Sequence, residues 1–295
     1  MTLPPLYKYL DVQGAKLTLG NQTFKHAKPS DFNDTKDLTI RSIFPEEIGE
    51  AVAKIEAGFL DALLQYLDVE PTCSSPRKER IQAIQRGIRD KPEMVDIIRA
   101  ENEKLGSVFD YETVKTASES FLAEINEFMQ EYRILCVTTH LNSEKMWADY
   151  ADNHQGIALR IEPNLAKDSI FSLFRPVSYV ENRPTLYDDS LEFISQSLFG
   201  DQMEIRKAII DKIIYSKTLK WKEEGEYRLS IPLRQGENWN TLKYHPEEIT
   251  ELYLGLEMET IHMESTVSLA QGINPDISIF LSKRSSNGDL IFESL

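Results

Sequence analysis

The sequence predicts an α/β fold in which a mixed β-sheet carries a helical insertion. Strand-like segments occur near the N-terminus and again after residue 132. Between them, residues 46–132 place apolar side chains at steps of three and four, which is the spacing of one helix face. No repeat of fixed period and no low-complexity linker divides the chain. We therefore expect a single domain over residues 1–295 with a helical insertion at about 46–132.

The individual elements follow from the same patterns. The segment Arg133–Thr139 is apolar on both alternating faces, which is typical of a central strand. The other expected strands are Leu6–Tyr9, Lys16–Leu19 and residues 156–161, 226–233, 249–255 and 277–284. Helices are expected from Ile48, around residues 81–88, over 114–132, over 191–213 with a kink at Gly200, and over 258–271. Residues 27–37 predict a loop.

Composition and charge exclude several classes of protein. The net charge of −15 disfavours non-specific binding to nucleic acid or to anionic lipid. No apolar run approaches the ~20 residues that span a bilayer, and no secretory signal is visible, so we expect a cytoplasmic protein without a membrane partner. Cys73 and Cys136 form neither a CxxC pair nor a Cys/His cluster, which excludes zinc-finger and disulfide scaffolds. Cys136 is expected in the core.

The segment NSEKMWADYADNHQG predicts a helix with three aromatic side chains on one face. Ser143 is a suitable N-cap, and Gly156 can end the helix in a left-handed conformation. Between them Trp147, Tyr150 and His154 share a face, where they could stack on a planar ligand and hydrogen-bond to it. The alternative is that Trp147 and Tyr150 pack the helix on the sheet, which is the commoner role of aromatic stripes.

The segment LKWKEEGEYRLSIPL predicts a strand with one polar face. If the backbone is extended from Glu224, then Glu224, Glu226, Arg228 and Ser230 point the same way, and the intervening apolar residues face the core. Two carboxylates and a guanidinium could orient a substrate and stabilise a developing positive charge. The alternative is a solvated face with an ordinary ion pair.

Motif searches find no phosphate-binding loop, dinucleotide fingerprint, nucleophile elbow or HExxH helix. The acidic cluster Asp31, Asn33, Asp34 and Asp37 lacks the spacing of a calcium loop and predicts a turn instead. His154 has no other His, Cys or paired carboxylate at ligand spacing, so we expect no metal there.

Several segments in a fixed order resemble a bacterial family. These are LYKY, FND, MWADYADNHQGIALRI, WKEEGEYR and LYLG, and together they resemble domain-of-unknown-function family 2971 over nearly the whole chain. A more distant likeness is to ADP-ribosyltransferases. Glu224-Gly225-Glu226 is similar to the Glu-x-Glu element of those enzymes, and Val137-Thr138-Thr139 is similar to their Ser/Thr-rich strand. Lys8 stands where their early Arg or His is expected, so that anchor is not matched.

The distant likeness implies cleavage of the nicotinamide–ribose bond of NAD, without a metal. In that reaction Glu226 would stabilise the oxocarbenium-like transition state, and Glu224 would position the acceptor, which could be water. Trp147 and Tyr150 would stack on nicotinamide, and Lys8, Arg160 or Arg228 would contact the pyrophosphate. Tyr7, Thr138 and His154 complete the expected ligand-binding set.

Two other functions compete with NAD cleavage. The same aromatic and acidic surfaces could bind a protein partner or sense a ligand without catalysis, in bacterial stress or phage defence. A nuclease is the third hypothesis, disfavoured by the net charge. NAD turnover separates the first function from the second, and metal-dependent nucleic-acid cleavage would indicate the third.

Overall fold

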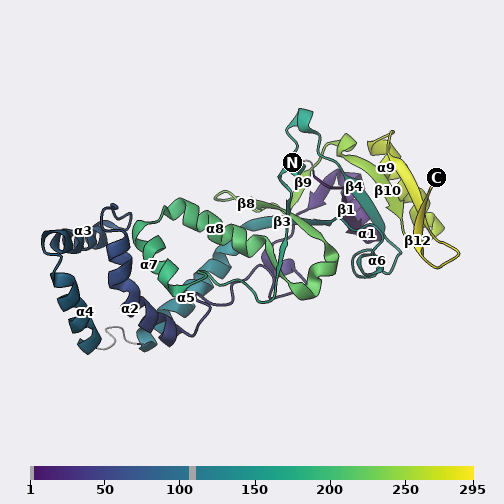
Figure 1. Cartoon of the computed structure of the whole chain (residues 1–295). Helices are drawn as coiled ribbons and strands as arrows, with labels where there is room; N and C mark the ends of the chain where they lie inside the picture. Colours follow the sequence, from purple (N-terminus) through teal and green to yellow (C-terminus); the bar gives the residue numbers. More distant parts are fainter. Residues whose placement is uncertain (1–2, 106–110) are drawn as a thin grey trace. The chain divides into compact units, whose positions relative to one another are not determined.

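The computed structural model describes residues 3–105 and 111–295 (Figure 1). The chain divides into two compact units. Unit 1 consists of the described residues up to Asp37 together with Met129–Glu181 and Ile214–Leu295, and unit 2 consists of Leu38–Phe128 and Asn182–Ile213. The single domain over residues 1–295 stays a prediction, since compactness within each unit does not test it. No helix among the described residues is long and apolar enough to cross a membrane.

Unit 1 is built on a mixed eight-stranded sheet, which confirms the predicted fold class. All of its strand pairs are antiparallel except β10 with β11. In spatial order the strands are β12 (Leu290–Ser294), β11 (Ser278–Arg284), β10 (Ile249–Leu254), β4 (Ile157–Ile161), β1 (Leu6–Leu10), β3 (Tyr132–Thr138), β8 (Glu226–Pro232) and β5 (Arg175–Pro176).

Smaller elements surround this sheet in unit 1. The two-stranded sheets are β2 (Thr23–Lys25) with β9 (Thr241–Lys243), and β6 (Ser178–Val180) with β7 (Ser216–Thr218). The α-helices are α1 (Val12–Asn21), α6 (Glu144–Tyr150) and α9 (Thr260–Ile273). Five short 3₁₀ helices are described in this unit: η1 (Pro29–Asp31), η2 (Leu165–Lys167), η3 (Ile170–Leu173), η4 (Leu219–Glu224) and η5 (Pro246–Glu248).

The sheet has an apolar core on each face, as its alternating side chains require. On β1, Leu6 joins a large core that includes residues of α1 and α9, and these two helices pack against each other. Tyr7 and Tyr9 of the same strand point to the opposite core, where α6 contributes Met146 and Trp147. Successive side chains of β1 therefore point to opposite faces of the sheet, one packed against α1 and α9 and the other against α6.

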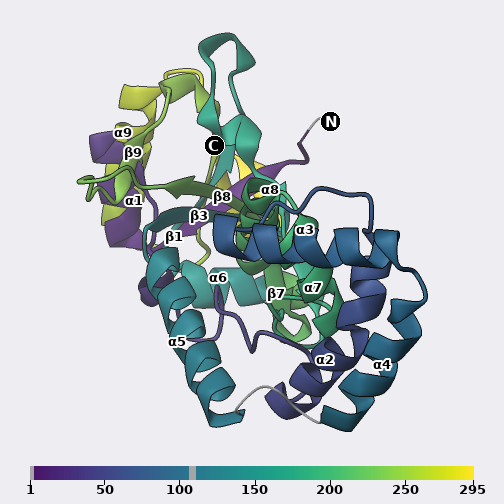
Figure 2. The same ribbon diagram turned by 90° about the vertical axis from the view of Figure 1, so that its left-hand side faces the viewer.

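Unit 2 is helical within the part of the chain that the structure describes. Its helices are α2 (Ile48–Gln65), α3 (Ser75–Asp90), α4 (Met94–Leu105), α5 (Tyr111–Met129), α7 (Ser190–Phe199) and α8 (Gln202–Ile214). The last residue of α5 and the last residue of α8 belong to unit 1. Figure 2 shows α2 and α7 running alongside each other, and both contribute to one buried cluster with Leu63 and Ile194 at its centre. The helical part therefore draws on two chain segments, not only on the expected 46–132.

Three predicted elements were wrong. Lys16–Leu19 is not a strand but part of α1, because Asp11 caps that helix by accepting a hydrogen bond from Gly14 N at 2.5 Å. The helix expected to run to Tyr132 ends at Met129, and Tyr132 begins β3. The helix expected to bend at Gly200 ends at Phe199, and a second helix starts at Gln202.

The sheet opens between β1 and β3. These strands pair only at Tyr7 and Thr138, and β1 then turns away into α1. Further along β3, Ile134 exchanges backbone hydrogen bonds of 2.8 and 2.9 Å with Ala27, which follows β2. Cys136 lies between these two points, where β3 has no strand partner on this side among the described residues.

Gly156 is required where β4 begins beside the end of β1. A Cβ atom at this position would lie 2.1 Å from the carbonyl oxygen of Leu10, which is backbone and cannot rotate away. We expect Gly156→Ala to lower the free energy of unfolding by about 1–3 kcal/mol, the usual range for overpacking.

Gly20→Ala is the matched control, because Gly20 lies in α1 with nothing near its missing Cβ. Alanine favours a helix by about 1 kcal/mol over glycine, so this variant should be as stable as the parent or more so. Tryptophan fluorescence during urea unfolding measures both effects in unit 1, since Trp147, Trp221 and Trp239 all belong to it. Equal stability of the two variants would contradict the close-approach explanation.

Candidate functional site

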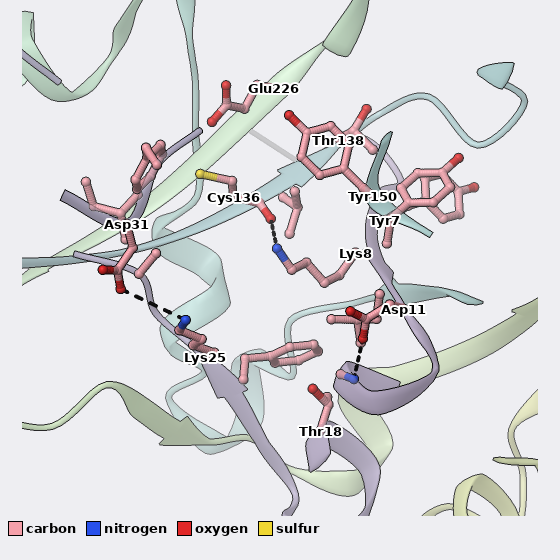
Figure 3. A pocket seen from close by; sticks show the side chains of 18 of the residues that line it. Tyr7, Lys8, Asp11, Thr18, Lys25, Asp31, Cys136, Thr138, Tyr150 and Glu226 are labelled. Carbon is pink, nitrogen blue, oxygen red and sulfur yellow. Dashed lines mark hydrogen bonds and ion pairs between the residues drawn. The ribbon is translucent and has the colours of Figure 1, made fainter. Parts of the chain in front are cut away.

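A cavity of about 850 Å³ lies in unit 1 at the opening of the sheet. Its walls come from β1, α1, β2 and the loop after it, β3, α6, β7, η4, β8 and β9. Six of the residues predicted at the site line it, and Figure 3 shows most of them: Tyr7, Lys8, Thr138, Tyr150, Glu224 and Glu226. Six of the ten predicted site residues therefore meet at one cavity, and the other four do not line it. Their role as ligand-binding or catalytic residues stays a prediction.

Glu224 and Glu226 reach the cavity through a turn, not through a continuous strand. Glu224 ends η4, Gly225 adopts a left-handed conformation with φ of 52°, and β8 starts only at Glu226. The expectation of an extended backbone from Glu224 was therefore wrong. Thr138 Oγ1 fixes the turn by donating to the Glu224 carbonyl oxygen at 2.5 Å.

Lys217, from β7, joins the two carboxylates. Its ammonium donates to Glu224 Oε2 at 2.5 Å and to Glu226 Oε2 at 2.8 Å. The same nitrogen lies 3.9 Å from Asp37 Oδ2. Because both glutamates bind one nitrogen, they lie side by side at the wall of the cavity.

Arg228 holds Glu226 and Asp37 from the other side. Its guanidinium donates to Glu226 Oε1 at 2.7 Å and to Asp37 Oδ2 at 2.6 Å, and also to the carbonyl oxygen of Ile214 at 2.7 Å. We call the five side chains the ionic cluster: Asp37, Lys217, Glu224, Glu226 and Arg228. Asp37 and Lys217 were not among the predicted site residues, although Asp37 was noted in the acidic turn.

The ionic cluster is almost completely buried. The exposed fractions of its side chains run from 0% for Arg228 to 7% for Lys217. Burying charges costs several kcal/mol per ion unless they are well paired, and an apolar cluster would often be as stable. The five side chains are three carboxylates and two cations, a formal charge of −1 between them. Buried ionisable groups with shifted pKa values beside a cavity are typical of a functional site.

The cations decide the ionisation of Glu226. Burial alone would raise its pKa, but Arg228 and Lys217 outweigh burial and lower the pKa to about 2. For Lys217, burial acts to lower the pKa, yet Glu226 and Glu224 raise it above the ordinary lysine value. Both carboxylate and ammonium are therefore charged at neutral pH.

Tyr150 connects α6 to the ionic cluster. Its hydroxyl donates to Glu224 Oε1 at 2.8 Å. Burial and the negative charge of Glu224 both raise the pKa of the phenol, which stays protonated. On the other side, Glu226 N donates to the hydroxyl of Tyr179 at 2.9 Å. The tyrosines thus fix the turn between η4 and β8.

The predicted aromatic face does not form as expected. The helix α6 ends at Tyr150, and Asp152, Asn153 and His154 have φ of 48°, 51° and 67°, which no α-helix accommodates. His154 folds back so that its ring stacks on Trp147, with centroids 5.8 Å apart. Trp147 has no exposed surface and donates to the carbonyl oxygen of Leu141, so it is a core residue and cannot stack on a ligand.

The two predicted arginines also lie away from the cavity lining. Arg160, on β4, is paired with Glu251 at 2.6 Å and with Glu162. Arg228 is wholly enclosed by the ionic cluster and has no surface left for a pyrophosphate. Cys136, expected in the core, is only partly buried and lines the cavity. The cations that do line the cavity are Lys8, Lys25 and Lys217.

The acidic turn has a structural role beside the site. Asp34 accepts hydrogen bonds from Trp221 Nε1 at 2.7 Å and from Lys220 at 2.9 Å, which fastens the loop after β2 to η4. Burial opposes the charge on Asp34, but Lys220 and Trp221 lower its pKa to about 2. Among the described residues, no group of three or more His, Cys, Asp or Glu side chains is placed to hold a metal ion.

Comparison with known proteins gives one family. The family described as protein of unknown function (DUF2971) matches residues 146–229, which confirms the resemblance to it over this segment. The segment contains Tyr150, Lys217, Glu224 and Glu226. Searches of curated proteins and of solved structures return no match, and the likeness to ADP-ribosyltransferases receives no support.

The low pKa of Glu226 predicts how stability depends on pH. Because the pKa in the folded state, about 2, lies below the ordinary value of 4.5, the stabilisation is complete above pH 4.5 and is lost as the pH falls toward 2. The expected loss is on the order of 3 kcal/mol, since one pKa unit corresponds to about 1.4 kcal/mol. Urea unfolding at several pH values between these limits measures it.

Glu226→Gln should remove this part of the pH dependence, because the variant has no proton to bind at that position. Glu293→Gln is the control, since that carboxylate is exposed and paired with Lys283 on the surface. A Glu226→Gln protein with the full acid sensitivity of the parent would show that other groups cause it.

Proposed function

We propose that the cavity binds NAD and that the chain cleaves the bond between nicotinamide and ribose, with water or another nucleophile as acceptor. One observation carries the proposal: two carboxylates, two tyrosines, a threonine and a lysine predicted for this chemistry line a single cavity. The volume of about 850 Å³ lies within the range of roughly 300–1,000 Å³ that small-molecule sites have.

The charge of the ionic cluster supports this chemistry. Loss of nicotinamide leaves positive charge on the ribose ring, and a fixed negative charge in a dry site lowers the energy of that transition state. Glu226 is engaged by two cations, whereas Glu224 is engaged by Lys217 alone and otherwise accepts from the neutral phenol of Tyr150. The negative charge of Glu224 is therefore less neutralised by cations than that of Glu226, so Glu224 is the carboxylate proposed to stabilise the ribose cation. Glu226 holds Lys217 in place.

The rest of the lining suits a dinucleotide. Tyr7 and Tyr150 offer aromatic surface for the nicotinamide ring. Lys8 and Lys25 are the cations that line the cavity outside the ionic cluster, so they are the groups proposed for the pyrophosphate. This reassigns the pyrophosphate contact from Arg160 and Arg228 to Lys25, with Lys8 retained. Consumption of NAD would suit a part in bacterial stress or phage defence.

The hydrogen bonds of the Glu226 carboxylate favour a second function. Both of its oxygens already accept charged hydrogen bonds from Arg228 and Lys217. Such a carboxylate is well suited to hold a binding site rigid and poorly suited to move or take part in a reaction. A non-catalytic module that binds a small ligand in the same cavity is therefore the alternative proposal.

Nicotinamide release from NAD, followed by chromatography, tests the enzymatic proposal. We expect release by the parent and a fall of about a hundredfold or more in rate for Glu224→Gln, because this change removes one preorganised charge. Tyr150→Phe should reduce the rate less, since it removes only the hydroxyl that donates to Glu224. The surface variant Glu293→Gln is the matched control and should retain the parent rate.

Thermal melts of each variant separate loss of chemistry from loss of fold. If the parent binds NAD but releases no nicotinamide, with or without cell extract as a source of acceptors, the binding-module proposal replaces catalysis. If it neither binds nor cleaves NAD, both the substrate and the reaction are wrong.

A further inference from the structure

Lys8 differs from the other lysines of the cavity in its partners. Its ammonium donates to the carbonyl oxygen of Cys136 at 3.0 Å and has no ion-pair partner among the side chains that the structure describes. Lys217, in contrast, is held by two carboxylates, and Lys25 is largely exposed and lies 3.9 Å from Asp31. Figure 3 shows Lys8 reaching from β1 across the cavity toward Cys136.

The opening of the sheet explains this position. On the side of β3 that faces β1, Ile134 is paired with Ala27, and Thr138 lies opposite Tyr7. The Cys136 carbonyl between them is left without a strand partner on that side, and an unpaired carbonyl would be costly to bury. The side chain of Lys8 supplies the hydrogen bond in place of a strand. This hydrogen bond places the amine of Lys8 between β1 and β3, where the sheet opens and the cavity lies.

We propose that Lys8 is a nucleophilic amine that forms an imine with a small hydroxylated aldehyde or ketone bound in this cavity. The proposal does not depend on NAD cleavage, because it uses the amine of Lys8 and not the ionic cluster. Lysines that serve this chemistry in proteins are desolvated or lie near another cation, so that the neutral amine is accessible at moderate pH.

The surroundings of Lys8 make the neutral amine easier to reach than in an ordinary lysine, although the ammonium is the form proposed to meet a pyrophosphate. Burial lowers its pKa below the ordinary value, and Lys25 of β2 acts in the same direction. Cys136 of β3 and Glu226 of β8 act the other way but do not cancel the effect of burial. A single hydrogen bond to a carbonyl oxygen also restrains the nitrogen less than an ion pair does.

The uncharged part of the lining indicates the class of ligand. Hydroxyl and amide side chains border the cavity on the side of α1, β2 and β9, and they can bind the hydroxyls of a short sugar-like chain: Thr18, Asn21, Thr23, Asn240 and Thr241. A carbonyl compound with adjacent hydroxyls would contact these residues while its carbonyl carbon meets Lys8. A purely apolar aldehyde would leave them unpaired.

The step is a condensation without net oxidation or reduction. The lone pair of the neutral Lys8 nitrogen attacks the carbonyl carbon, the π electrons move to the carbonyl oxygen, and that oxygen takes a proton from water. The hydroxide left from that water takes one proton from the nitrogen, which gives a carbinolamine. A second water protonates the hydroxyl, which leaves as water while the nitrogen lone pair forms the C=N bond. The hydroxide left from the second water then takes the remaining proton from the nitrogen. Lysine and carbonyl compound thus give imine and water.

Glycolaldehyde with sodium cyanoborohydride tests the proposal, since the reductant converts any imine into a stable secondary amine. Peptide mass mapping of the parent protein then shows which lysines are labelled. At neutral pH we expect Lys8 to be labelled first, faster than Lys25 and Lys283, by about tenfold for each unit by which the Lys8 pKa lies below that of an ordinary lysine. Propanal, which lacks the hydroxyl, should label Lys8 with a smaller preference.

Lys8→Arg and Lys25→Arg form the matched pair. Both keep a positive charge, but arginine forms no such imine, so only Lys8→Arg should abolish the fast label. Glu224→Gln changes the proposed NAD reaction without changing Lys8, so this variant should lose nicotinamide release and keep the fast label on Lys8. A fast label that persists without nicotinamide release separates the two proposals.

Peptide mass mapping of the labelled parent protein tests the proposal even if Lys8→Arg fails to fold. Labelling of Lys8 no faster than that of the exposed Lys25 and Lys283 would overturn it. A fast label on Lys217 instead would also overturn it, because that lysine is held as an ammonium by Glu224 and Glu226.

Discussion

The guanidinium of Arg228 is the group on which the site depends. It lies fully buried in β8 and binds the carboxylates of Glu226 and Asp37 together with the carbonyl oxygen of Ile214. Its rigid fork of donors reaches all three at once, which the single ammonium of a lysine could not do. Removal of this cation would take a charged hydrogen-bond partner from the buried carboxylates of Glu226 and Asp37, and breaking a buried pair in this way typically costs about 3–5 kcal/mol.

The rest of the site follows from that constraint. Once Arg228 fixes Glu226, Lys217 is drawn to the free side of the same carboxylate and brings Glu224 with it. Glu224 then offers an oxygen to Tyr150, so the end of α6 is held against the turn before β8. This part of the cavity wall is therefore a series of hydrogen bonds to charged groups that runs from the buried Arg228 to Tyr150 at the cavity.

Local patterns in the sequence predicted the fold class and much of the site. The alternation in β4 depends on neighbours two residues apart, β3 is a short run of apolar residues, and the helix face from Ile48 depends on neighbours three and four apart, so all three could be predicted from local sequence. Both glutamates of the Glu-Gly-Glu segment line the cavity, although Gly225 turns the chain where a strand was expected.

Other features arise only from tertiary contacts. Lys217 and Asp37 join the site from distant segments, and no spacing relates them to Glu226. The helix after Ser143 looked longer because Trp147, Tyr150 and His154 fit a helical face. Three successive left-handed residues end it early and fold the imidazole onto the indole. Alternation on Lys16–Leu19 was outweighed by the Asp11 cap, which starts a helix whose inner side packs on α9.

The partners of Arg228 also bear on how this chain tolerates change over evolution. Asp37 is the last residue of unit 1 before the chain passes into unit 2, and Ile214 is the residue at which the chain finally returns. One side chain therefore anchors the departing and the returning backbone. Insertions, deletions or replacement of helices within Leu38–Phe128 and Asn182–Ile213 would leave the guanidinium and its partners in place. We expect relatives of this chain to vary most in the length and helix content of unit 2.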